Sequence, residues 1–427
     1  LNFQPFKDYS MQLKRVVVTG LGALTPIGNT VSEYWNNLLA GKSGAAPIQQ
    51  FDASLFKTQF ACEVKGFDVE QFIDKKEARK MDQFTQYAMV SVMEAVDHSG
   101  LIESNPNLDR IGVVWGSGVG GLKTFQDESK AFFEGDGTPR FNPFFIPKMI
   151  ADIAAGQISI KYGFRGPNYV TVSACASSNN AIIDAFNLIR LGKADAIITG
   201  GSEAAVNEMG MGGFNALKAL STRNDDPQTA SRPFDLDRDG FVLGEGAGAL
   251  ILEEYEHAIK RGATIYAEVV GGGMSGDAYH MTAPHPEGIG ARNTMIAALE
   301  DAEINPDQVD YINVHGTSTP LGDIAEVKAI QAVFGEHAYA LNISSTKSMT
   351  GHLLGAAGAI EAIACVLAVK NDMVPPTINH FTDDPEIDPK LNFTFNAPQK
   401  RTVNYAISNT FGFGGHNTSV VVKKFTA

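Results

Sequence analysis

The sequence has little cysteine, and the cysteines it has are scattered. Cys62, Cys175 and Cys365 form no CxxC pair and no Cys/His pair at metal-ligand spacing. An odd number at such intervals disfavours both a disulfide framework and a structural zinc site. We therefore expect a protein of the reducing cytoplasm.

The sequence also has few basic residues for its length and no long apolar run. Lysine and arginine number 34 against 48 aspartate and glutamate, a formal charge of -14, which argues against nonspecific binding to nucleic acid or an anionic membrane. No stretch reaches the roughly 18 consecutive apolar residues of a spanning helix, and the N-terminus lacks a signal-peptide pattern. We expect no nucleic-acid partner and no membrane insertion, and any basic docking site must be local.

The composition that remains is typical of a globular enzyme. Hydrophobic residues make up 44% and charged residues 19%, and 43 glycines allow close backbone packing. A chain of 427 residues favours two related halves over one simple domain. Residues 1–10 precede a strong strand, so we expect them to be an extension, or residues added to the chain, outside the fold.

Strand-like and helix-like segments alternate along the chain. β-Branched runs closed by glycine predict buried strands, and apolar residues at helical spacing predict amphipathic helices. In the first half, strands are predicted at 14–28, 111–121 and 196–203, and helices at 31–44, 80–100 and 181–195. The order restarts near Ala267, with a helix at 293–304, a strand at 311–317, a helix at 355–370 and a final strand, turn and strand over 404–424. The pattern predicts an α/β fold with a parallel or mixed sheet, whose two similar halves form one rigid body.

Cys175 is the first residue that could carry chemistry. It lies between a strand-like segment and a helix, so its sulfur is expected near a helix N-terminus, where amides and the helix dipole favour a thiolate. The alternative is a buried apolar cysteine, which is the preferred interpretation of Cys62 and Cys365. The small neighbours of Cys175 leave room for a substrate, but the residues alone leave both interpretations open.

His315 follows a predicted strand and precedes a run of hydroxyl residues. A strand-terminal histidine beside a loop is well placed for proton transfer, although many lone histidines only hydrogen-bond the adjacent turn. Asp323, a few residues later, is predicted to cap the next helix rather than to take part in catalysis.

Two further segments add polar groups to the same chemistry. Lys347 and His352 bracket a short turn that could aim both at one cavity; the alternative for Lys347 is a solvated surface lysine. Glycines on either side of Phe413 permit unusual backbone angles and expose amides. Together the segments offer a nucleophile, proton-handling groups and an oxyanion site, which favours acyl transfer.

These segments, in this order, resemble a known family. SACASS, HGTSTPLGD, STKSMTGHLLGAAGAIE and NTFGFGGHN are similar to the β-ketoacyl-[acyl carrier protein] synthases of the thiolase superfamily, most closely their type II elongating members, and the segment 221–248 looks like a further family signature. The likeness runs from about Arg15 to Lys424. It implies a thiolase-like five-layered α/β/α/β/α fold of two pseudo-symmetric halves, with the active site at their junction and usually as a homodimer. Residues 11–265 would form the half with the nucleophile and insertions, and 266–427 the half with the catalytic histidines and the gating loop.

The resemblance also implies a reaction. It is the decarboxylative Claisen condensation of an acyl-enzyme thioester with malonyl-[acyl carrier protein], which yields 3-oxoacyl-[acyl carrier protein] and CO₂ in fatty acid elongation. Cys175 would carry the acyl chain, and its N–H and that of Phe413 would form the oxyanion hole. Neutral His315 and His352 would bind the malonyl thioester carbonyl, and Lys347 would order the site. The partner would be acyl carrier protein, with no redox or organic cofactor.

The remaining residues that the resemblance marks fall into four groups. Thr317 and Thr319 would contact the pantetheine arm, Phe413 would also be a gate, Val119 would line the acyl pocket near the dimer interface, and Phe411 is a further substrate-binding residue. Asn313, Glu361 and Ser408 are a candidate site for a structural monovalent cation. Lys76, Arg79 and Lys80, with Arg140 and Arg223, would dock the acidic carrier; the alternative is an ordinary solvated helix face. The departures from the family pattern are His416, Asn179 and Asn180.

Four other functions compete with this prediction. A thiolase would be expected to have a second cysteine near the C-terminal glycine-rich loop, and an initiating synthase would pair cysteine with histidine and asparagine. A catalytically silent chain-length partner should lack Cys175. A cysteine hydrolase needs no second histidine and no lysine around one carbonyl. Preferred chain length, and fatty acid against polyketide synthesis, stay open.

Overall fold

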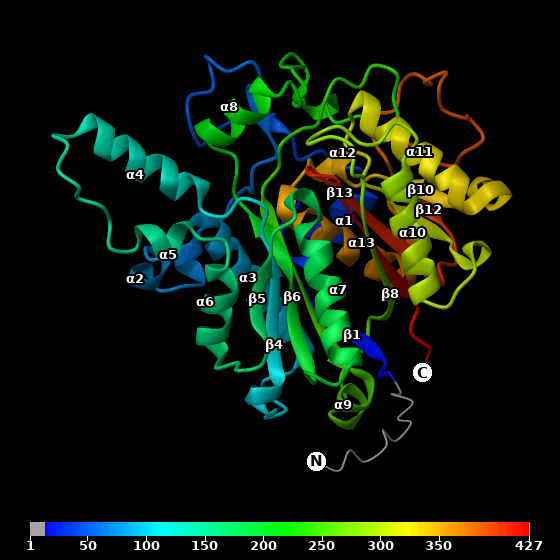
Figure 1. The fold of residues 1–427 in the computed structure, drawn as a ribbon, viewed down its shortest axis with the longest axis horizontal. Helices are drawn as coiled ribbons and strands as arrows, with labels where there is room; N and C mark the ends of the chain where they lie inside the picture. The colour runs from blue at the N-terminus through cyan, green and yellow to red at the C-terminus, as the bar shows by residue number, and fades with distance from the viewer. Residues whose placement is uncertain (1–12, 427) are drawn as a thin grey trace, which may run out of the picture.

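A ten-stranded mixed sheet organises the chain in the computed structural model, which describes residues 13–426 (Figure 1). The expected extension at residues 1–10 lies outside the described residues. The strand order is β10-β9-β13-β14-β8-β1-β7-β6-β4-β5. The strands of this sheet are β1 Val16–Leu24, β4 Ile111–Gly116, β5 Asn168–Thr171, β6 Ala196–Glu203, β7 Gly246–Glu254, β8 Ala267–Gly276, β9 Tyr311–Asn313, β10 Asn342–Ser344, β13 Tyr405–Gly412 and β14 His416–Lys423. Two small two-stranded sheets pair β2 Ala46–Pro47 with β3 Phe60–Ala61, and β11 Met373–Val374 with β12 Gln399–Lys400.

The sheet has an internal repeat about its centre. β1 and β8 pair antiparallel there through Val16–Val269, Val17–Glu268 and Val18–Ala267. Moving outward, β7, β6, β4 and β5 on one side match β14, β13, β9 and β10 on the other, with antiparallel inner pairs and parallel outer pairs. The expected pair of similar halves is therefore present, and the two are joined edge to edge as one continuous sheet.

Helices complete five layers. α3 and α6 cover the first half of the sheet on its outer face, α7 and α13 pack against each other between the halves, and α10 and α11 cover the second half (Figure 1). This is the α/β/α/β/α arrangement that the resemblance implied. The helices are α1 Val31–Leu39, α2 Lys75–Ala78, α3 Gln83–Ser99, α4 Leu122–Glu134, α5 Phe145–Met149, α6 Ile153–Tyr162, α7 Ser177–Arg190, α8 Glu208–Ala216, α9 Tyr255–Lys260, α10 Ile289–Asp301, α11 Pro320–Phe334, α12 Lys347–Thr350 and α13 Ala357–Asn371.

Local sequence signals set many of the element ends. The side chain of Asp82 caps α3 by accepting the N–H of Phe84, and Gly100 ends the helix with φ 60°. Asp323, in contrast, does not cap α11 as predicted. The helix begins three residues earlier, at Pro320, with Thr319 as the N-cap. Proline suits the first turn because the amide it lacks has no partner there.

The middle-layer helix is the most apolar in the structure. The segment Leu354–Asn371 is long and apolar enough to span a membrane, but 89% of it is buried inside the protein. No other helix of the described residues meets that criterion. A helix that packs on all sides in a core has the same composition, and this is where α13 lies.

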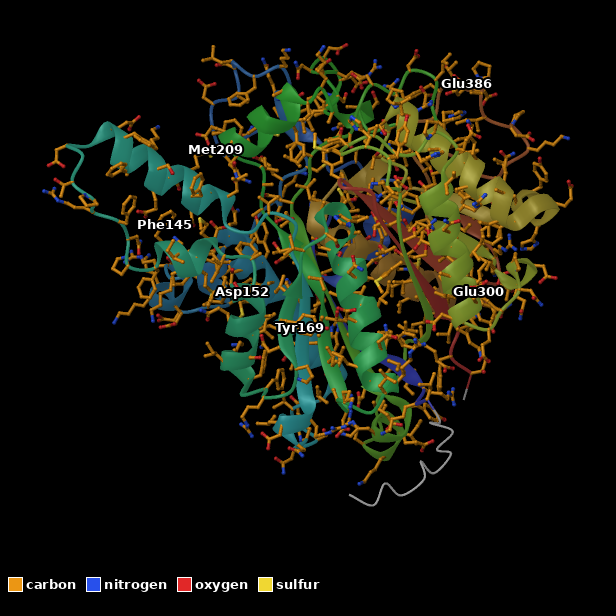
Figure 2. All side chains as sticks on the ribbon, viewed as in Figure 1. Phe145, Asp152, Tyr169, Met209, Glu300 and Glu386 are labelled. Atoms are coloured by element: carbon orange, nitrogen blue, oxygen red, sulfur yellow. The ribbon has the colours of Figure 1, made fainter. Side chains whose placement is uncertain are left out.

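An arm formed by α4, α5 and their connection projects from the sheet, at the left of Figure 1. Phe132, Phe141 and Phe145 stack in sequence along it, with ring centroids 5.4 and 5.5 Å apart. Phe133, at the end of α4, is 81% exposed. Figure 2 shows the side chains of this arm, with Phe145 labelled. The arm thus presents aromatic surface away from the core.

Candidate active site

Cys175 lies in a sharp turn between a strand and a helix. β5 ends at Thr171, one 3₁₀ turn spans Ala174–Ala176, and α7 begins at Ser177. The turn is strained at Ala174, whose φ of 51° falls in the left-handed region. The predicted position at a helix N-terminus is confirmed. The second half repeats the turn before α13 with Leu354 at φ 48°, but without a cysteine.

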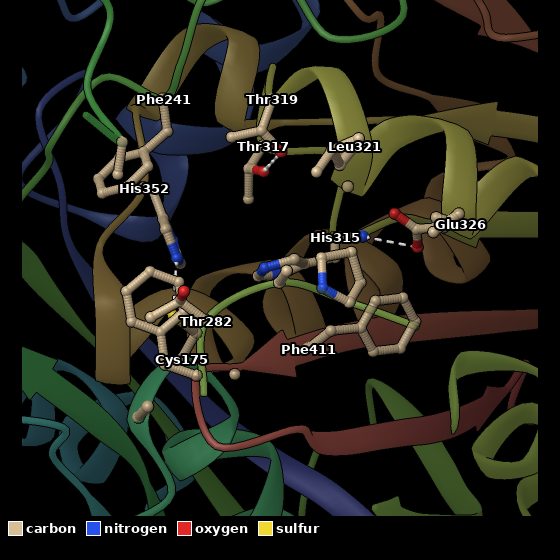
Figure 3. Close-up of a pocket in the computed structure, with 18 of the residues that line it drawn as sticks. Cys175, Phe241, Thr282, His315, Thr317, Thr319, Leu321, Glu326, His352 and Phe411 are labelled. Carbon is tan, nitrogen blue, oxygen red and sulfur yellow. Dashed lines mark hydrogen bonds between the residues drawn. The ribbon is translucent and has the colours of Figure 1, made fainter. Parts of the chain in front are cut away.

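Two histidines from the second half meet this sulfur (Figure 3). Cys175 Sγ lies 3.0 Å from His352 Nε2. His315 follows β9, and its ring centroid lies 5.2 Å from that of His352 at an angle of 86°. One ligand atom from each of the three residues lies within 4.8 Å of the others. The fold therefore brings together three residues that the sequence holds far apart.

The main chain and an aromatic ring hold His352 in place. Its N–H donates to the carbonyl of Val242 at 2.8 Å, and the N–H of Gly244 donates to its carbonyl at 2.9 Å. The ring of Phe241 meets the imidazole edge-on, with centroids 5.3 Å apart. These residues belong to the 221–248 signature, to which the sequence analysis assigned no role. Phe241 is a site residue that it missed.

A buried carboxylate holds the backbone at His315. The N–H groups of His315 and Gly316 donate to the two oxygens of Glu326 at 2.9 and 2.7 Å. Burial raises the pKa of Glu326 to about 7, although these amides act in the opposite direction. The sequence analysis missed Glu326. The available signal was a carboxylate among the apolar residues of the helix now seen as α11.

Lys347 is buried and paired, so the alternative of a surface lysine is wrong. Its Nζ lies 2.5 Å from Glu361 Oε1, and both side chains are 1% exposed. Glu361 thereby has the partner that its place on an apolar helix requires. The turn does not aim Lys347 and His352 at one cavity as predicted. His352 lines the cavity, whereas Lys347 lies behind it.

Burial controls the charge of all three central groups. It lowers the pKa of His315 and His352 well below the usual value, and the charge of Lys347 lowers both further. Burial also raises the pKa of the Cys175 thiol to about 12, while Lys347 and the N–H groups of Phe413 and Cys175 oppose that rise. The prediction that the helix N-terminus favours the thiolate is therefore wrong for the free protein. The rise of the thiol pKa caused by desolvation is larger than the fall that the helix N-terminus causes.

The alkylation of Cys175 should report this directly. Only the thiolate reacts, and its fraction rises tenfold per pH unit below the pKa. With the thiol pKa raised to about 12, the iodoacetamide rate constant should climb about tenfold per unit from about pH 7 to about pH 10 without levelling. Intact mass against time measures it, with Cys175→Ala as the blank. A rate that is flat near neutral pH would instead indicate a preformed thiolate–imidazolium pair.

Two backbone amides lie near the sulfur. The N–H groups of Phe413 and Cys175 both favour the thiolate of Cys175 and so oppose the rise of its pKa. Gly412 makes this approach feasible, because an added Cβ would lie 2.7 Å from Ser173 O and 3.1 Å from Cys175 N. The oxyanion role expected of these two amides stays a prediction.

These groups open into one cavity of about 530 Å³. The hydroxyls of Thr317 and Thr319 lie 3.0 Å apart on its wall, and the ring of Phe411 is 5.6 Å from that of His315. Lys218, which the sequence analysis missed, is an exposed cation on the cavity lining. The predicted residues that line the cavity are Cys175, His315, His352, Thr317, Thr319, Val119, Phe411 and Phe413.

Comparison with known families finds two domains along the chain. Residues 13–258 match the description "Beta-ketoacyl synthase, N-terminal domain", and residues 266–381 match "Beta-ketoacyl synthase, C-terminal domain". The chain belongs to the β-ketoacyl synthase family. Members of this family are condensing enzymes that transfer acyl groups, so the prediction of an acyltransferase is confirmed at that level.

Individual relatives agree over almost the whole length. Proteins named 3-oxoacyl-[acyl-carrier-protein] synthase 2 from Synechocystis sp. and Staphylococcus aureus are 51% and 53% identical over 97% of this chain and cover 99% and 100% of their own. A β-ketoacyl synthase structure from Burkholderia phymatum superposes with a TM-score of 0.90 at 36% identity, over 97% of this chain and 100% of its own. A structure of a type II polyketide synthase acyl-carrier protein in complex with its ketosynthase, bound to the hexaketide, superposes with a TM-score of 0.89 at 35% identity. The match covers 97% of this chain and 100% of that chain. The predicted thiolase-like fold is confirmed.

The glycine-rich loop of this β-ketoacyl synthase is tied to the segment that follows β8. The N–H of Asp277 donates to Gly415 O at 2.9 Å, and Asn417 donates to the Asp277 carboxylate at 2.8 Å. The N–H of Gly414 donates to Met281 O at 2.7 Å. His416, a departure from the family pattern, is exposed and does not line the cavity. The sequence analysis did not anticipate this connection.

The other two departures lie inside the middle layer. Asn179 is buried and donates to Ser408 O at 3.1 Å, which ties α7 to β13. Asn180 Oδ1 accepts a hydrogen bond from the hydroxyl of Ser173 at 2.5 Å, and Ser173 lies two residues before Cys175. Asn180 therefore supports the turn that carries Cys175, Asn179 holds α7 against the sheet, and both lie outside the cavity lining.

The predicted docking residues of the β-ketoacyl synthase lie on the surface away from the cavity lining. Lys76 and Arg79 are exposed on and after α2, and Lys80 pairs with Glu77 at 2.7 Å. Arg140, on the projecting arm, lies 3.6 Å from Asp136, and half-buried Arg223 donates to Asp237 O at 3.0 Å. None of these contacts tests a docking role.

The side chains of the candidate cation site offer the oxygen ligands that a monovalent cation requires. Asn313 and Ser408 are register partners on β9 and β13. Asn313 Oδ1 and Ser408 Oγ are buried, and neither has a hydrogen-bond partner within residues 13–426. Hard cations take such oxygen donors. Glu361 already pairs with Lys347, so the occupancy of this site stays a prediction.

Proposed function

We propose that this β-ketoacyl synthase condenses a Cys175-bound acyl chain with malonyl-[acyl carrier protein], which extends the chain and releases CO₂. The observation that carries the proposal is the meeting of a cysteine, two neutral histidines and two converging amides in one cavity. The relatives named 3-oxoacyl-[acyl-carrier-protein] synthase 2 support this assignment. A single hydrolytic step would need fewer of these groups.

In the first half-reaction Cys175 takes the acyl chain from its carrier. The new Sγ–C bond forms as the carrier's S–C bond breaks, and the thiol proton leaves with the carrier thiol. His352 Nε2, 3.0 Å from Sγ, is within reach of that proton. The N–H groups of Cys175 and Phe413 stabilise the oxyanion of the tetrahedral intermediate. Thioester exchange is close to balanced in energy, so the acyl-enzyme can wait for the second substrate.

In the second half-reaction the histidines act on the malonyl thioester. Loss of CO₂ breaks a C–C bond and leaves its electron pair on an enolate, whose oxygen accepts hydrogen bonds from His315 and His352. The lowered pKa of both rings keeps them neutral, so each can donate through Nε2 without a full charge. The enolate carbon attacks the acyl carbonyl, the Sγ–C bond breaks, and Cys175 leaves as a thiolate that takes up one proton from solvent, with His352 Nε2 3.0 Å away to pass it on.

The remaining residues order the substrates. Lys347 holds Glu361 behind the cavity and places a positive charge near the histidines. Thr317 and Thr319 offer hydroxyls on the cavity wall to the pantetheine arm. Val119 is 43% exposed on the cavity lining, where it borders the acyl chain, and Phe411 and Phe413 line the same cavity.

Intact mass of the wild-type protein after incubation with acyl-[acyl carrier protein] of graded chain length tests the proposal. We expect a gain of one acyl group, and then loss of that group together with CO₂ release when malonyl-[acyl carrier protein] is added. Acylation followed by hydrolysis without condensation would favour a cysteine hydrolase. No gain at any length, with a donor proven active, would favour a silent partner subunit.

Docking of the carrier should depend on the basic residues around α2. Acyl carrier protein is acidic, and this enzyme carries a net charge of -14, so a local basic patch must guide the approach. The double variant Lys76→Glu, Arg79→Glu should lower kcat/KM for the carrier-bound acyl donor about tenfold or more at low salt. Lys260→Glu on α9 is the matched control, because Lys260 is also exposed and has no ion-pair partner in the described chain. An equal loss in all variants, or one that persists with a small acyl thioester, would contradict carrier docking there.

A second copy of this chain is the proposed occupant of the free sheet edge. β10 at one edge is buried, whereas β5 at the other exposes Tyr169 by 38%, and Val172 just after it is 62% exposed. An open edge with apolar side chains invites another strand, and the aromatic arm of α4 and α5 lies on the same side of the molecule (Figure 1). Light scattering should give twice the chain mass; a monomer at working concentration would contradict a homodimer.

The cytoplasmic location of the protein stays a prediction, which cell fractionation tests.

A further inference from the structure

Glu203 is a buried carboxylate at the end of β6 with no part in the proposed chemistry. Its side chain is fully buried, and five donors converge on it. Oε1 accepts from the N–H groups of Val119 and Gly120, both at 3.1 Å, and from the Ser117 hydroxyl at 3.2 Å. Oε2 accepts from the N–H groups of Gly118 at 2.7 Å and Gly355 at 3.1 Å. Both oxygens are therefore fully used.

The donors come from two segments that border the cavity. Gly118 and Val119 line it. Gly355 precedes α13 and follows His352 by three residues. An added Cβ on Gly118 would lie 2.9 Å from Glu203 Oε2 and 3.1 Å from Ala174 O, and one on Gly355 would lie 2.7 Å from the same carboxylate oxygen. The two glycines are thus packed around the carboxylate, directly beside the turn that carries Cys175.

We propose that Glu203 is a positioning residue that fixes the Val119 wall of the cavity relative to Cys175 and thereby sets the acyl chain length that the enzyme accepts. This inference rests on the proposed function. Val119 is held here by three consecutive amides, because its own N–H and those of Gly118 and Gly120 all donate to this carboxylate. A wall held this firmly can discriminate by volume, and a loose wall cannot.

The substitution Glu203→Gln tests the anchor with almost no change of shape. A carboxylate only accepts hydrogen bonds, whereas an amide accepts at its oxygen and donates at its nitrogen. Because both oxygens of Glu203 already face N–H or O–H donors, the amide nitrogen must oppose at least two of them. The loop or the start of α13 then has to move away.

Glu245 provides a matched control in the same half of the protein. It is equally buried, and its Oε1 accepts from Gln50 at 2.7 Å, Tyr87 at 3.0 Å and the N–H of Val64 at 3.1 Å. Its Oε2 has no partner among the described residues. Glutamine can keep all three bonds there and place its nitrogen at the free position. Glu245 does not line the cavity, so Glu245→Gln should leave selectivity unchanged.

The experiment measures acylation of Cys175 by intact mass for a series of acyl-[acyl carrier protein] lengths. The readout is the ratio of the rate for the best length to the rate for a longer chain that the wild type disfavours. One methylene against a pocket wall changes such rates about tenfold, so we expect this ratio to fall by about that factor in Glu203→Gln and to stay within about twofold in Glu245→Gln. An equal loss at every length in Glu203→Gln would overturn the proposal, because a merely structural residue lowers all rates together.

One further variant and the wild-type result make the outcome of this experiment unambiguous. Ser117→Ala removes only the hydroxyl donor 3.2 Å from Glu203. If Glu203→Gln does not fold by circular dichroism, a lowered ratio in Ser117→Ala supports the anchor and an unchanged ratio overturns it. If the wild type is not acylated at any length, the proposed function fails. If it is acylated with a clear length preference and neither variant alters that preference, this inference alone fails.

Discussion

Replacement of Cys175 by alanine should abolish acylation and lower condensation about 10⁴-fold or more, as removal of a covalent nucleophile does in other acyl-transfer enzymes. Neither of the other two cysteines can replace it, because Cys62 and Cys365 are 1% and 0% exposed in the core and do not line the cavity. Release of CO₂ from malonyl-[acyl carrier protein] uses the histidines instead, so the variant should retain it. This split between the two half-reactions follows from where the groups lie around the cavity.

Intact mass after incubation with an acyl donor measures the first half, and trapped CO₂ measures the second. Cys62→Ala is the control, because Cys62 is also buried with a pKa raised to about 12 but does not line the cavity. A mass gain that persists in Cys175→Ala would move the nucleophile to another residue. Loss of both half-reactions together with unfolding would show only that the turn needs its thiol for packing.

The second large effect is expected at the histidines. His315→Ala or His352→Ala should each slow malonyl decarboxylation about 10²- to 10³-fold, the usual loss when one donor to a developing oxyanion is removed. The two losses should not add in the double variant, because both rings serve the same enolate oxygen. Acylation of Cys175 should continue in His315→Ala, since the imidazole nitrogen 3.0 Å from the sulfur belongs to His352.

Single-turnover CO₂ release measures this, with thermal unfolding to verify that each variant is folded. His98→Ala is the control, because His98 is exposed on α3, bonds only a backbone carbonyl and does not line the cavity. Full decarboxylation by either cavity variant would refute the role assigned to that histidine. Equal losses in acylation and decarboxylation for His315→Ala would instead assign it to general organisation of the site.

Much of the local structure could be predicted from the sequence because its causes are local. The helix ending at Gly100 follows from a glycine that adopts φ 60° at low cost. The position of Cys175 between a strand and a helix follows from the change of hydrophobic period on either side of it. The glycines around Phe413 signal a tight approach that the position of Gly412, beside Ser173 and Cys175, bears out.

The incorrect and missing predictions have a different physical origin. The thiol of Cys175 is harder to ionise than a helix N-terminus suggests, because desolvation depends on everything packed around the sulfur. Lys347 is internal only because Glu361, on another helix, lies 2.5 Å away. Asp323 accepts the N–H of Phe234 at 2.9 Å, far along the chain, and so does not cap its own helix. Glu203, Phe241 and Glu326 were missed for the same reason.

By itself, the sequence determined the order of strands and helices, the set of chemical groups and, through the resemblance of its motifs to known proteins, the family. These depend on side-chain type and on neighbours a few residues away. Only the tertiary structure decided which of those groups share a cavity, which are charged and which buried carboxylates hold the loops in place. Distances, desolvation and hydrogen-bond partners come from segments that the fold brings together, and no local pattern contains them.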